Sequence, residues 1–405
     1  MLIAAELVLV VMWLRLAVLC VLGIVGAWRS RDDRRLLAQP VADGWAPRVS
    51  VVIPALNEEA TIEATLLSLF QQDLVPWEII VVDDGSDDAT SEIARRCLAT
   101  FERGMVIELA VNAGKAEALN TGVRAASGAY IATIDADTRI ERGGLQSAAR
   151  SLHAHDAGAV AFYLTAESGD RVLERLQRQE YAAGLNFERA GQHVIGAISI
   201  LPGAATLYRR ELLLEVPFSL RTRTEDADHT LQLARRGVRL VLDADAVAMT
   251  VVPATWRDLI AQRIRWTAGH LQCCLAHLRA SNSAHTIFRA VVLPNFVVST
   301  WIVAVGFVAM LTVLAGGHTP LFQFGWFDAA AITVFLVYLQ RGSACLVNAK
   351  HQPRLADFVM EPFVTNIIGS VSFIGASYVL LRPSRVFKPV VRFPLQSSYT
   401  KPHKY

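Results

Sequence analysis

Two aspartates, Asp135 and Asp137, directly follow a run of strand-forming residues from Tyr130 to Ile134. In an extended chain, residues two positions apart project to the same side, so we expect both carboxylates to face one point. Carboxylate oxygens at a strand end suit Mg²⁺ or Mn²⁺, ions that keep several waters and bridge phosphate oxygens. The spacing predicts a site for a divalent metal and a diphosphate. A polar turn after a buried strand is the alternative interpretation of a single Asp-x-Asp.

Polar side chains also follow two earlier runs of buried-strand sequence. Asp83 and Asp84 come after one of them, and Asn57 and Glu59 come after the other, which we expect to end at Pro54. In open parallel sheets, ligands bind outside the carboxyl ends of the strands. Three separate segments are therefore expected to bring polar groups to one edge.

The phosphate-binding groups are expected to be cations rather than backbone amides. The chain has no G-x-G-x-x-G motif and no Walker-type loop. Lys115, at the start of a predicted helix, is the candidate cation, with a solvent-exposed lysine as the alternative.

The segment from Thr224 to Asp228 opens another predicted helix with several acids in its first turn. Thr224 followed by acids is a good capping arrangement, so capping alone would explain the pattern. The alternative is that Asp226 is a general base at the mouth of the same crevice.

Gln262, Arg265 and Trp266 share one face of a predicted surface helix from 256 to 278, because they stand at i, i+3 and i+4. A guanidinium beside an indole can bind phosphate while the ring stacks on a sugar. The alternative is an interfacial helix that uses arginine and tryptophan as bilayer anchors.

The elements that position these groups alternate between strand and helix. Strands are predicted at 49–53, 77–82, 105–109 and 130–134, and helices at 62–69, through 93–97, and at 115–126, 172–189, 224–236 and 256–278. This repetition predicts an α/β fold with a doubly wound, mostly parallel sheet.

The apolar content of 53% and the mean hydropathy of +0.35 predict a membrane component. Residues 2–28 form a nearly unbroken apolar run that contains Arg15, and about 20 helical residues are enough to cross the hydrocarbon. No basic region precedes this run, so we expect a retained anchor rather than a signal peptide. The four arginines between 29 and 35 place its end in the cytoplasm.

Three further runs are long enough to span: 291–315, 329–348 and 358–381. The segment 316–328 lacks lysine and arginine and should be external. Counting spans puts the C-terminus outside, whereas the basic residues after 381 argue for inside, which would make one late segment re-entrant or interfacial. We expect Arg341 to snorkel to the cytoplasmic surface, and the alternative is that it lines a polar path.

Several other classes of function are excluded or disfavoured. The net charge of +2, without a basic stripe, does not favour nucleic acid. The five cysteines have no metal-ligand spacing. His153 and His155 are expected on a helix exterior rather than as a metal pair.

Taken together, the motifs resemble those of the membrane-bound family-2 glycosyltransferases, which are inverting, processive polysaccharide synthases. The motifs are Asp83-Asp84-Gly85, Asp135-Ala-Asp137, Thr224-Glu225-Asp226 and Gln262-x-x-Arg265-Trp266. Within this family, the sequence is most similar to that of poly-β-1,6-N-acetylglucosamine synthases. The similarity lies in segments 114–120, 179–181 and 252–253. Pro202-Gly203 departs from the family, which often has a serine, cysteine or other small residue before the glycine. The single N-terminal span is a second departure, because some relatives have two.

The resemblance implies a role for each matching residue. Asn57, Glu59, Asp83 and Asp84 would hold the uridine, and Lys115 and Asp135 would position the donor. Asp137, with Asp135, would bind Mg²⁺ or Mn²⁺, and Asp226 would be the general base. The acceptor and diphosphate would be held by Glu225, Gln262, Arg265, Trp266 and Gly203.

The resemblance also implies a GT-A glycosyltransferase domain and its surroundings. The expected organisation is a transmembrane helix (1–28), a linker (29–47), a cytoplasmic GT-A domain (48–254), an interfacial helix (255–283), membrane helices (284–381) and a basic tail (382–405). The expected activity is polymerisation of a UDP-sugar, UDP-N-acetylglucosamine above others, into a β-linked polysaccharide that crosses the plasma membrane. Expected partners are the growing glycan, the bilayer and a small accessory subunit, but no nucleic acid.

Alternatives remain open at this point. A single transfer to a lipid acceptor would use the same nucleotide site, and a hyaluronan, chitin or cellulose synthase would share all of the motifs. A non-enzymatic sensor would be expected to lack one of the carboxylates, and all of them are present.

Overall fold

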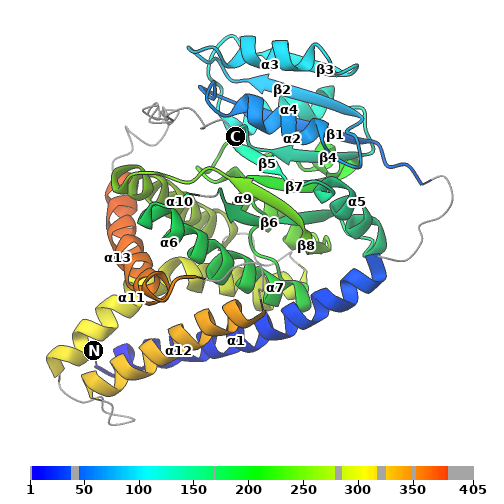
Figure 1. Cartoon of the computed structure of the whole chain (residues 1–405). Coiled ribbons are helices and arrows are strands. Elements are labelled where there is room, and N and C mark those ends of the chain that lie inside the picture. The colour runs from blue at the N-terminus through cyan, green and yellow to red at the C-terminus, as the bar shows by residue number, and fades with distance from the viewer. Residues whose placement is uncertain are drawn as a thin grey trace.

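A mixed eight-stranded sheet forms the centre of the chain (Figure 1). The computed structural model describes residues 2–37, 45–167, 169–278, 285–316, 325–347 and 353–381. The strands are β1 (Val49–Ala55), β2 (Glu78–Asp83), β3 (Gly104–Glu108), β4 (Tyr130–Ile134), β5 (Thr138–Ile140), β6 (Ala159–Ala166), β7 (Ala205–Arg209) and β8 (Leu240–Thr250). Their order across the sheet is β3-β2-β1-β4-β7-β6-β8-β5.

The first half of the sheet is parallel, as the alternation of strands and helices predicted. Strands β3, β2, β1 and β4 run in the same direction, and β1 and β2 are buried along their whole length, as is typical of parallel strands. Strand β7 then pairs antiparallel with β4 and β6, whereas β6 and β8 are parallel. The predicted fold class is confirmed, and the antiparallel pairs in the second half are an addition to it.

The predicted strand over 49–53, stopped by Pro54, is two residues too short, because β1 continues through Pro54 to Ala55. Pro54 pairs with Val82 of β2, but the pairing of β1 with β4 already ends at Val52 and Thr133. Proline cannot donate a backbone hydrogen bond, and the strand tolerates it where only one neighbour remains.

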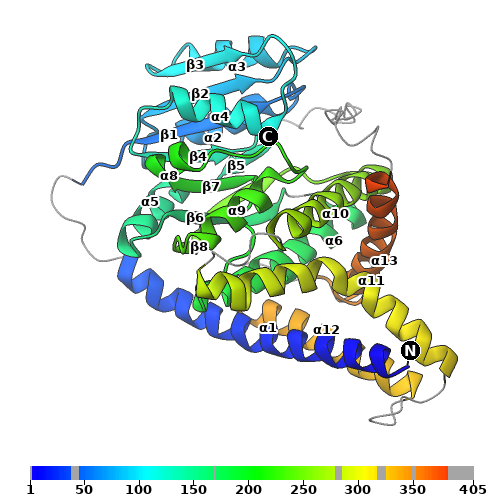
Figure 2. The ribbon, with the colours of Figure 1, turned by 180° about the vertical axis from the view of Figure 1, so that it is seen from behind.

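Helices cover both faces of the sheet, so the domain has three layers (Figure 2). Helices α2 (Ile62–Phe70), α3 (Thr90–Leu98) and α5 (Gly144–Ala154) contribute to the core on one face. The opposite face is covered by α4 (Lys115–Ala125), α8 (Arg210–Glu215), α9 (Glu225–Arg235) and α10 (Trp256–Leu278). Helices α4, α9 and α10 begin within one or two residues of the predicted positions.

The long helix predicted over 172–189 is divided by a π-helical segment. It consists of α6 (Val172–Glu180), η1 (Tyr181–Asn186) and α7 (Phe187–Val194). A π segment widens the helix and changes the direction of the side chains that follow it, and such segments are frequent at functional sites.

Within the described residues, three helices are long and apolar enough to cross a membrane: α1 (Leu2–Leu37), α12 (Trp326–Val347) and α13 (Leu355–Leu380). Helices α1 and α12 lie side by side beneath the sheet domain in both views (Figures 1 and 2). The predicted span at 291–315 falls on η3 (Phe288–Val292) and α11 (Leu293–Gly316). Many side chains of α11 lie outside the described residues, so this span stays a prediction.

The first helix is longer than the sequence indicated. It continues to Leu37, into the segment that was expected to be a linker. Residues 38–44, most of the expected external loop (317–324) and the basic tail (382–405) lie outside the described residues.

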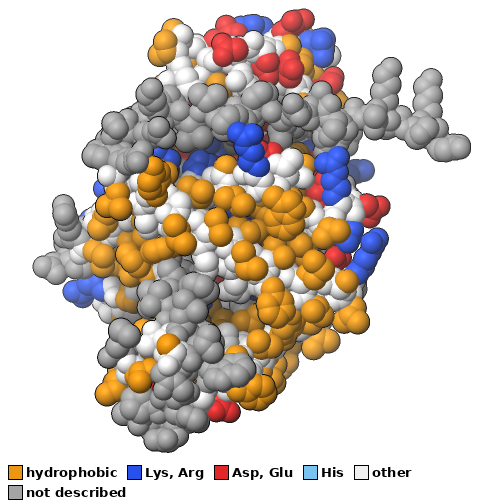
Figure 3. Space-filling view, turned by 90° about the vertical axis from the view of Figure 1, so that its left-hand side faces the viewer, with side chains coloured by type: hydrophobic (Ala, Val, Ile, Leu, Met, Phe, Trp, Pro, Cys, Tyr) orange, Lys and Arg blue, Asp and Glu red, His pale blue; other side chains and the backbone are white. Residues whose placement is uncertain are grey.

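Apolar side chains gather on the face of the molecule that carries α13 (Figure 3). Phe363, Ile367 and Ile374 of α13 are all more than half exposed, and their spacing places them on one side of the helix. This side is suited to contact with lipid.

Arg341 does not snorkel, and that expectation is wrong. Its guanidinium nitrogens lie 2.9 and 3.1 Å from the carboxylate oxygens of Glu361 on α13, and both side chains are buried. An ion pair removes the need to reach the membrane surface, because the partner charge is provided inside the protein.

A second polar cluster connects the membrane helices to α7. Arg15 of α1 lies 3.3 Å from Glu188, and Gln340 of α12 donates to the same carboxylate at 3.2 Å. Glu6, which like Arg15 is a charged residue of α1, is also buried. The charges in the first apolar run are therefore directed at protein rather than lipid.

The expectation of two exterior histidines is right for His153 and wrong for His155. His153 is exposed, whereas His155, which follows α5, is buried against Asp33 of α1. Asp33 lies more than a hundred residues away in the sequence, so no local pattern indicated the contact.

Helix α1 packs closely on α7 through two glycines. A Cβ atom at Gly26 would lie 2.4 Å from the backbone oxygen of Ala190, and one at Gly23 would lie 2.4 Å from the ring of Phe187. Small residues at such positions allow membrane helices to approach closely.

We expect Gly26→Ala to destabilise the protein by about 1–3 kcal/mol, the usual range for overpacking, because the contact is with backbone. Thermal unfolding of the purified protein in detergent measures this. Gly342→Ala on α12 is the control, because a Cβ atom there meets no atom within 4 Å. Equal unfolding temperatures for the two variants would contradict close packing of α1 on α7.

Candidate active site

A pocket of about 470 Å³ opens at the carboxyl ends of β1, β2 and β4. Five of the residues predicted from the sequence line it: Asp84, Lys115, Asp135, Glu225 and Arg265. The convergence of three strand ends at one edge of the sheet is thus observed.

Asp84 and Asp83 have different surroundings although they are adjacent. Asp84 faces the pocket and accepts hydrogen bonds from the backbone N–H groups of Ala113 and Gly114 at 2.7 and 2.8 Å. Asp83 instead accepts from the backbone and hydroxyl of Ser86 at 2.8 and 2.6 Å. Burial raises the pKa of the Asp84 carboxyl, although the two amide hydrogen bonds act to lower it.

Asn57 and Glu59 hold the loop that precedes α3. The Asn57 side-chain oxygen accepts from the backbone N–H of Asp87 at 2.9 Å, and the Glu59 carboxylate accepts from that of Ala89 at 3.1 Å. Glu58, which the sequence did not single out, lines the pocket instead. Asn57 has a positive φ of 56°, a conformation in which asparagine is favoured over most residues.

Lys115 is the charged centre of the pocket. Its Nζ lies 2.5 Å from Oδ1 of Asp135, 3.2 Å from Oε1 of Glu225 and 3.5 Å from the carbonyl oxygen of Gly203. Burial acts to lower the pKa of Lys115, but the charges of Asp135 and Glu225 raise it above its ordinary value. The lysine is a fixed cation, and the alternative of a solvent-exposed helix-start lysine is excluded.

Asp135 and Asp137 do not lie on an extended chain, so the argument from strand geometry does not hold. The backbone turns after β4, with the N–H of Thr138 donating to the carbonyl of Asp135 at 3.0 Å. Asp135 contacts Lys115, whereas Oδ1 of Asp137 accepts from the hydroxyls of Thr138 and Thr250 at 3.2 and 3.4 Å. The two carboxylates have different partners.

Asp226 lies in the first turn of α9, in contact with Gly203. Its Oδ2 accepts from the backbone N–H of Gly203 at 3.1 Å, and its Oδ1 accepts from that of Ala227 at 2.8 Å. A Cβ atom at position 203 would lie only 2.9 Å from Oδ2. Glycine is therefore required for this approach.

Thr224 stands at the N-cap position of α9, but its side chain makes no capping hydrogen bond. Its hydroxyl lies 3.7 Å from the sulfur of Cys273. A Cβ atom at Gly269 would be 2.4 Å from this hydroxyl. Helix α10 thus packs directly against Thr224, and the capping hydrogen bond predicted for Thr224 is not formed.

Arg263, which the sequence did not single out, stacks on Trp266. The guanidinium carbon of Arg263 lies 4.1 Å from the Trp266 ring centroid, and its nitrogens lie 2.8 Å from Glu180 and 3.1 Å from Gln262. Arg265 lines the pocket. On a helix, residues three positions apart are neighbours, so the spacing of Arg263 and Trp266 in the sequence could have indicated this contact.

Sequence reasoning missed several other pocket residues. They are Asn112, Leu220, Arg221, Thr222, Arg223 and Gln272. Residues 220–223 immediately precede α9, and proximity to Asp226 was the only signal for them.

The arrangement has the parts needed to bind a diphosphate and to remove a proton. Lys115 and arginines of the lining supply positive charge. Asp226 is not among the lining residues, but its carboxylate accepts from the N–H of Gly203, whose carbonyl oxygen lies 3.5 Å from Nζ of Lys115. The donors for a metal ion at Asp135 and Asp137 are all oxygen, which fits Mg²⁺ or Mn²⁺. Asp135 is already paired with Lys115, so Asp137 is the better suited of the two.

Comparison with protein families identifies the domain. Residues 50–216 match the family described as "Glycosyl transferase family 2". The match extends from β1 to the end of α8 and includes the strand ends that form the pocket.

Two curated relatives are similar to the chain. An "N-acetylglucosaminyltransferase" of Rhizobium meliloti (strain 1021) is 32% identical over 252 residues, which cover 59% of this chain and 59% of the relative. A "Poly-beta-1,6-N-acetyl-D-glucosamine synthase" of Staphylococcus aureus (strain COL) is 29% identical over 223 residues, 55% of this chain and 54% of the relative. The chain thus spans little more than half the length of these relatives.

Among solved structures, the mannosyltransferase PcManGT from Pyrobaculum calidifontis, in complex with GDP-Man and Mn²⁺, is similar with a TM-score of 0.59. The two chains are 24% identical, and the match covers 92% of this chain and 99% of that one. At this identity the similarity concerns the fold. The chain has the predicted GT-A fold, flanked by helices able to span a membrane.

We expect Lys115→Met to destabilise the protein by about 1–3 kcal/mol, because it leaves the partly buried carboxylates of Asp135 and Glu225 without their partner charge. Replacing Glu225 as well, in Lys115→Met/Glu225→Gln, should recover part of this loss. Thermal unfolding of the single and double variants measures both effects, with Lys115→Arg as the charge-preserving control. If the second substitution lowers stability further, charge compensation is not what Lys115 provides.

Proposed function

We propose that this chain, whose residues 50–216 match glycosyl transferase family 2, transfers a sugar from a nucleoside diphosphate to a glycan. One observation carries the proposal: Lys115 and Asp226 both contact Gly203, with Nζ of Lys115 at 3.5 Å from its carbonyl oxygen and Oδ2 of Asp226 at 3.1 Å from its backbone nitrogen. The cation is placed to neutralise a diphosphate, and the carboxylate is placed to accept a proton.

The proposed donor is UDP-N-acetylglucosamine. Two relatives that match more than half of the chain are named for transfer or polymerisation of N-acetylglucosamine. Asp84 lies in the pocket, where it can accept hydrogen bonds from a nucleoside. Asn57, Glu59 and Asp83 support it indirectly, because they hold the loop beside it.

The proposed metal ligand is Asp137, with Asp135 in a supporting position. A bound Mg²⁺ or Mn²⁺ would supply positive charge for the diphosphate. The hydroxyls of Thr138 and Thr250 fix the orientation of Asp137. Lys115 fixes Asp135 in the same way.

In the chemical step, Asp226 removes the proton from an acceptor hydroxyl as that oxygen attacks the anomeric carbon. The amides of Gly203 and Ala227 hold the carboxylate in place. Lys115 stabilises the charge that develops on the departing UDP. A single displacement inverts the anomer, so an α-linked donor gives a β-linked product.

The acceptor is proposed to lie along α10, between Asp226 and Trp266. Trp266 offers an aromatic face for a sugar ring, and Arg263 holds that indole from the other side. Arg265 in the pocket and Gln262 beside Arg263 complete this surface. Glu225 is held away from the acceptor by Lys115.

The product is proposed to be a polymer that leaves along the membrane helices. Gln179 on α6 contacts Cys345 on α12 at 3.5 Å, so the helices beside α10 reach directly into the membrane region. Buried charges inside membrane segments commonly mark a polar path, and the Arg341–Glu361 pair lies in this region. The arginines at the end of α1 favour a cytoplasmic catalytic domain, and the exposed face of α13 suits lipid or an accessory subunit.

We expect Asp226→Asn to reduce turnover by about 10²–10⁴-fold, the contribution of a positioned general base, and to leave UDP binding unchanged. UDP release and UDP affinity of the purified protein measure the two effects. Glu102→Gln, at an exposed acid outside the pocket, is the control. An Asp226→Asn variant that keeps most of its activity would show that another group is the base.

Product size distinguishes polymerisation from a single transfer to a lipid. With labelled UDP-N-acetylglucosamine, we expect a polymer that a hydrolase specific for β-1,6-linked N-acetylglucosamine degrades. A product with one added sugar would establish lipid transfer instead. Release of UDP only with another UDP-sugar would change the donor while leaving the proposed base intact.

A further inference from the structure

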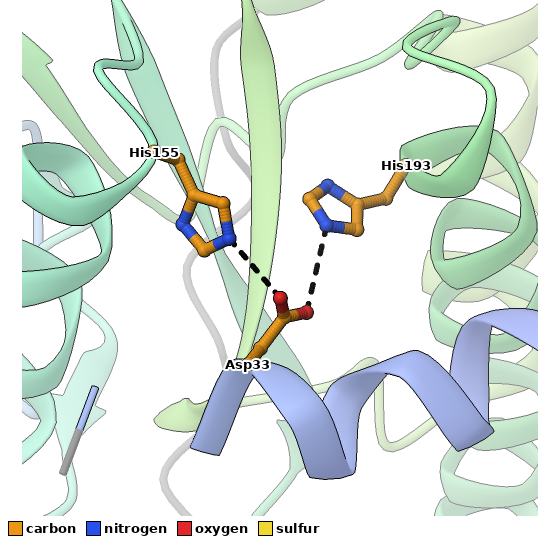
Figure 4. Close-up of side chains that lie close together, drawn as sticks. All are labelled: Asp33, His155 and His193. Atoms are coloured by element: carbon orange, nitrogen blue, oxygen red, sulfur yellow. Dashed lines mark hydrogen bonds and ion pairs between the residues drawn. The ribbon is translucent and has the colours of Figure 1, made fainter. Parts of the chain in front are cut away.

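A second cluster of titratable side chains lies where the end of α1 meets the sheet domain (Figure 4). It consists of Asp33 on α1, His155 after α5 and His193 on α7. Nε2 of His155 lies 3.1 Å from Oδ1 of Asp33, and Nε2 of His193 lies 3.7 Å from Oδ2. Both rings are directed at one carboxylate, and the three ligand atoms lie within 4.8 Å of one another.

The hydrogen bonds of His155 determine which ring nitrogen carries a proton. Its Nδ1 lies 3.0 Å from the carbonyl oxygen of Ser151, and a carbonyl oxygen only accepts, so Nδ1 carries hydrogen. In neutral histidine, Nε2 then presents a lone pair to the carboxylate of Asp33, which also only accepts. A positive species, either a proton or a metal ion, must therefore lie between them.

The same arrangement is the one in which histidine usually binds metals. Nδ1–H is fixed by a backbone carbonyl, and Nε2 is directed at the ion. Ligand atoms of a tetrahedral Zn²⁺ with bonds of about 2.0–2.1 Å are about 3.3 Å apart. The separation of 3.1 Å between Nε2 of His155 and Oδ1 of Asp33 is close to this value, and Nε2 of His193 lies 3.7 Å from the other oxygen, Oδ2. Two imidazoles and a carboxylate suit Zn²⁺, whereas Mg²⁺ prefers oxygen ligands.

His193 is the weaker ligand of the three. Its Nδ1 accepts the backbone N–H of Leu242 at 3.3 Å, so in neutral His193 the proton is on Nε2. Metal binding through Nε2 would transfer this proton to Nδ1 and break the long hydrogen bond. We therefore expect a smaller effect from loss of His193 than from loss of His155.

An adjoining cavity of about 380 Å³ gives the cluster access to solvent. Arg29, Arg239 and His285 also line it. The positive charge of the two arginines favours water or a small anion, rather than another cation, as the remaining ligand of the metal ion. The cavity lies apart from the candidate active site, with which it shares no lining residue among the described residues.

We propose that Asp33, His155 and His193 bind one transition-metal ion of the Zn²⁺ type. The ion joins the end of the membrane anchor α1 to α7 and to the segment after α5. Its role is structural, because it closes a contact between residues 33 and 193 that are distant in sequence. The proposal is independent of the proposed transferase activity.

The test uses the full-length protein in detergent, stripped of metal and kept in excess Mg²⁺ to fill sites that prefer oxygen ligands. After addition of ZnCl₂ and gel filtration, we expect one retained zinc per chain and a higher unfolding temperature. Asp33→Asn and His155→Gln should weaken Zn²⁺ binding by more than about 100-fold, because loss of an outer-shell partner alone costs 10–100-fold. His153→Gln, an exposed histidine two residues away, should retain zinc as the wild type does.

Two results would overturn the proposal. One is a wild-type protein that retains no zinc and shows no shift in unfolding temperature, in which case a proton holds the cluster. The other is equal retention by the wild type, Asp33→Asn and His155→Gln. The absorption spectrum of wild-type protein with Co²⁺ decides the question even if a variant fails to fold, since a four- or five-coordinate site gives intense visible bands and a spectrum of the aqueous ion contradicts it.

Discussion

The ion pairs of Lys115 are the interaction on which the arrangement of the active site depends. They join α4 to the end of β4 and to the start of α9, so one cation connects the parallel half of the sheet with the mixed half. Burial makes such a contact costly unless every charge is compensated. Because Lys115 is shared between Asp135 and Glu225, a movement of the lysine would leave both acids without their partner charge.

Gly203 and Gly269 allow the same kind of close approach on either side of α9. The first admits the carboxylate of Asp226, and the second admits the side chain of Thr224. Asp226 is therefore placed by packing as much as by hydrogen bonding. The departure of Pro202-Gly203 from the resembling family does not disturb this, because the glycine that the carboxylate requires is present.

Local sequence patterns were sufficient for the parts of the fold that are set by local physics. The bounds of β4 and α10 agree with prediction to the residue, since both are strongly patterned runs with clear ends. The convergence of Asp84 and Asp135 followed from the rule that parallel strands end at one edge. Fold class and pocket position could thus be predicted before any coordinates were known.

The partner of each side chain could not be predicted in the same way. Asp135 and Asp137 separate because the chain turns after Ile134, and Arg263 takes the position beside Trp266 because Glu180 attracts it from another helix. His155 meets Asp33 across more than a hundred residues. These choices depend on tertiary contacts, which single-sequence periodicity does not contain.

The contact of Gly26 with Ala190 gives the first helix a role beyond attachment. Its backbone packs on α7 as one core element packs on another, and α7 continues through the π segment into α6 beside the site. The position of the candidate active site relative to α1 is consequently set by close packing. A foreign transmembrane segment that replaced α1 by fusion at residue 38 would still attach the chain to a membrane. It would lack the packing on α7, so the position of the pocket relative to that segment would no longer be fixed.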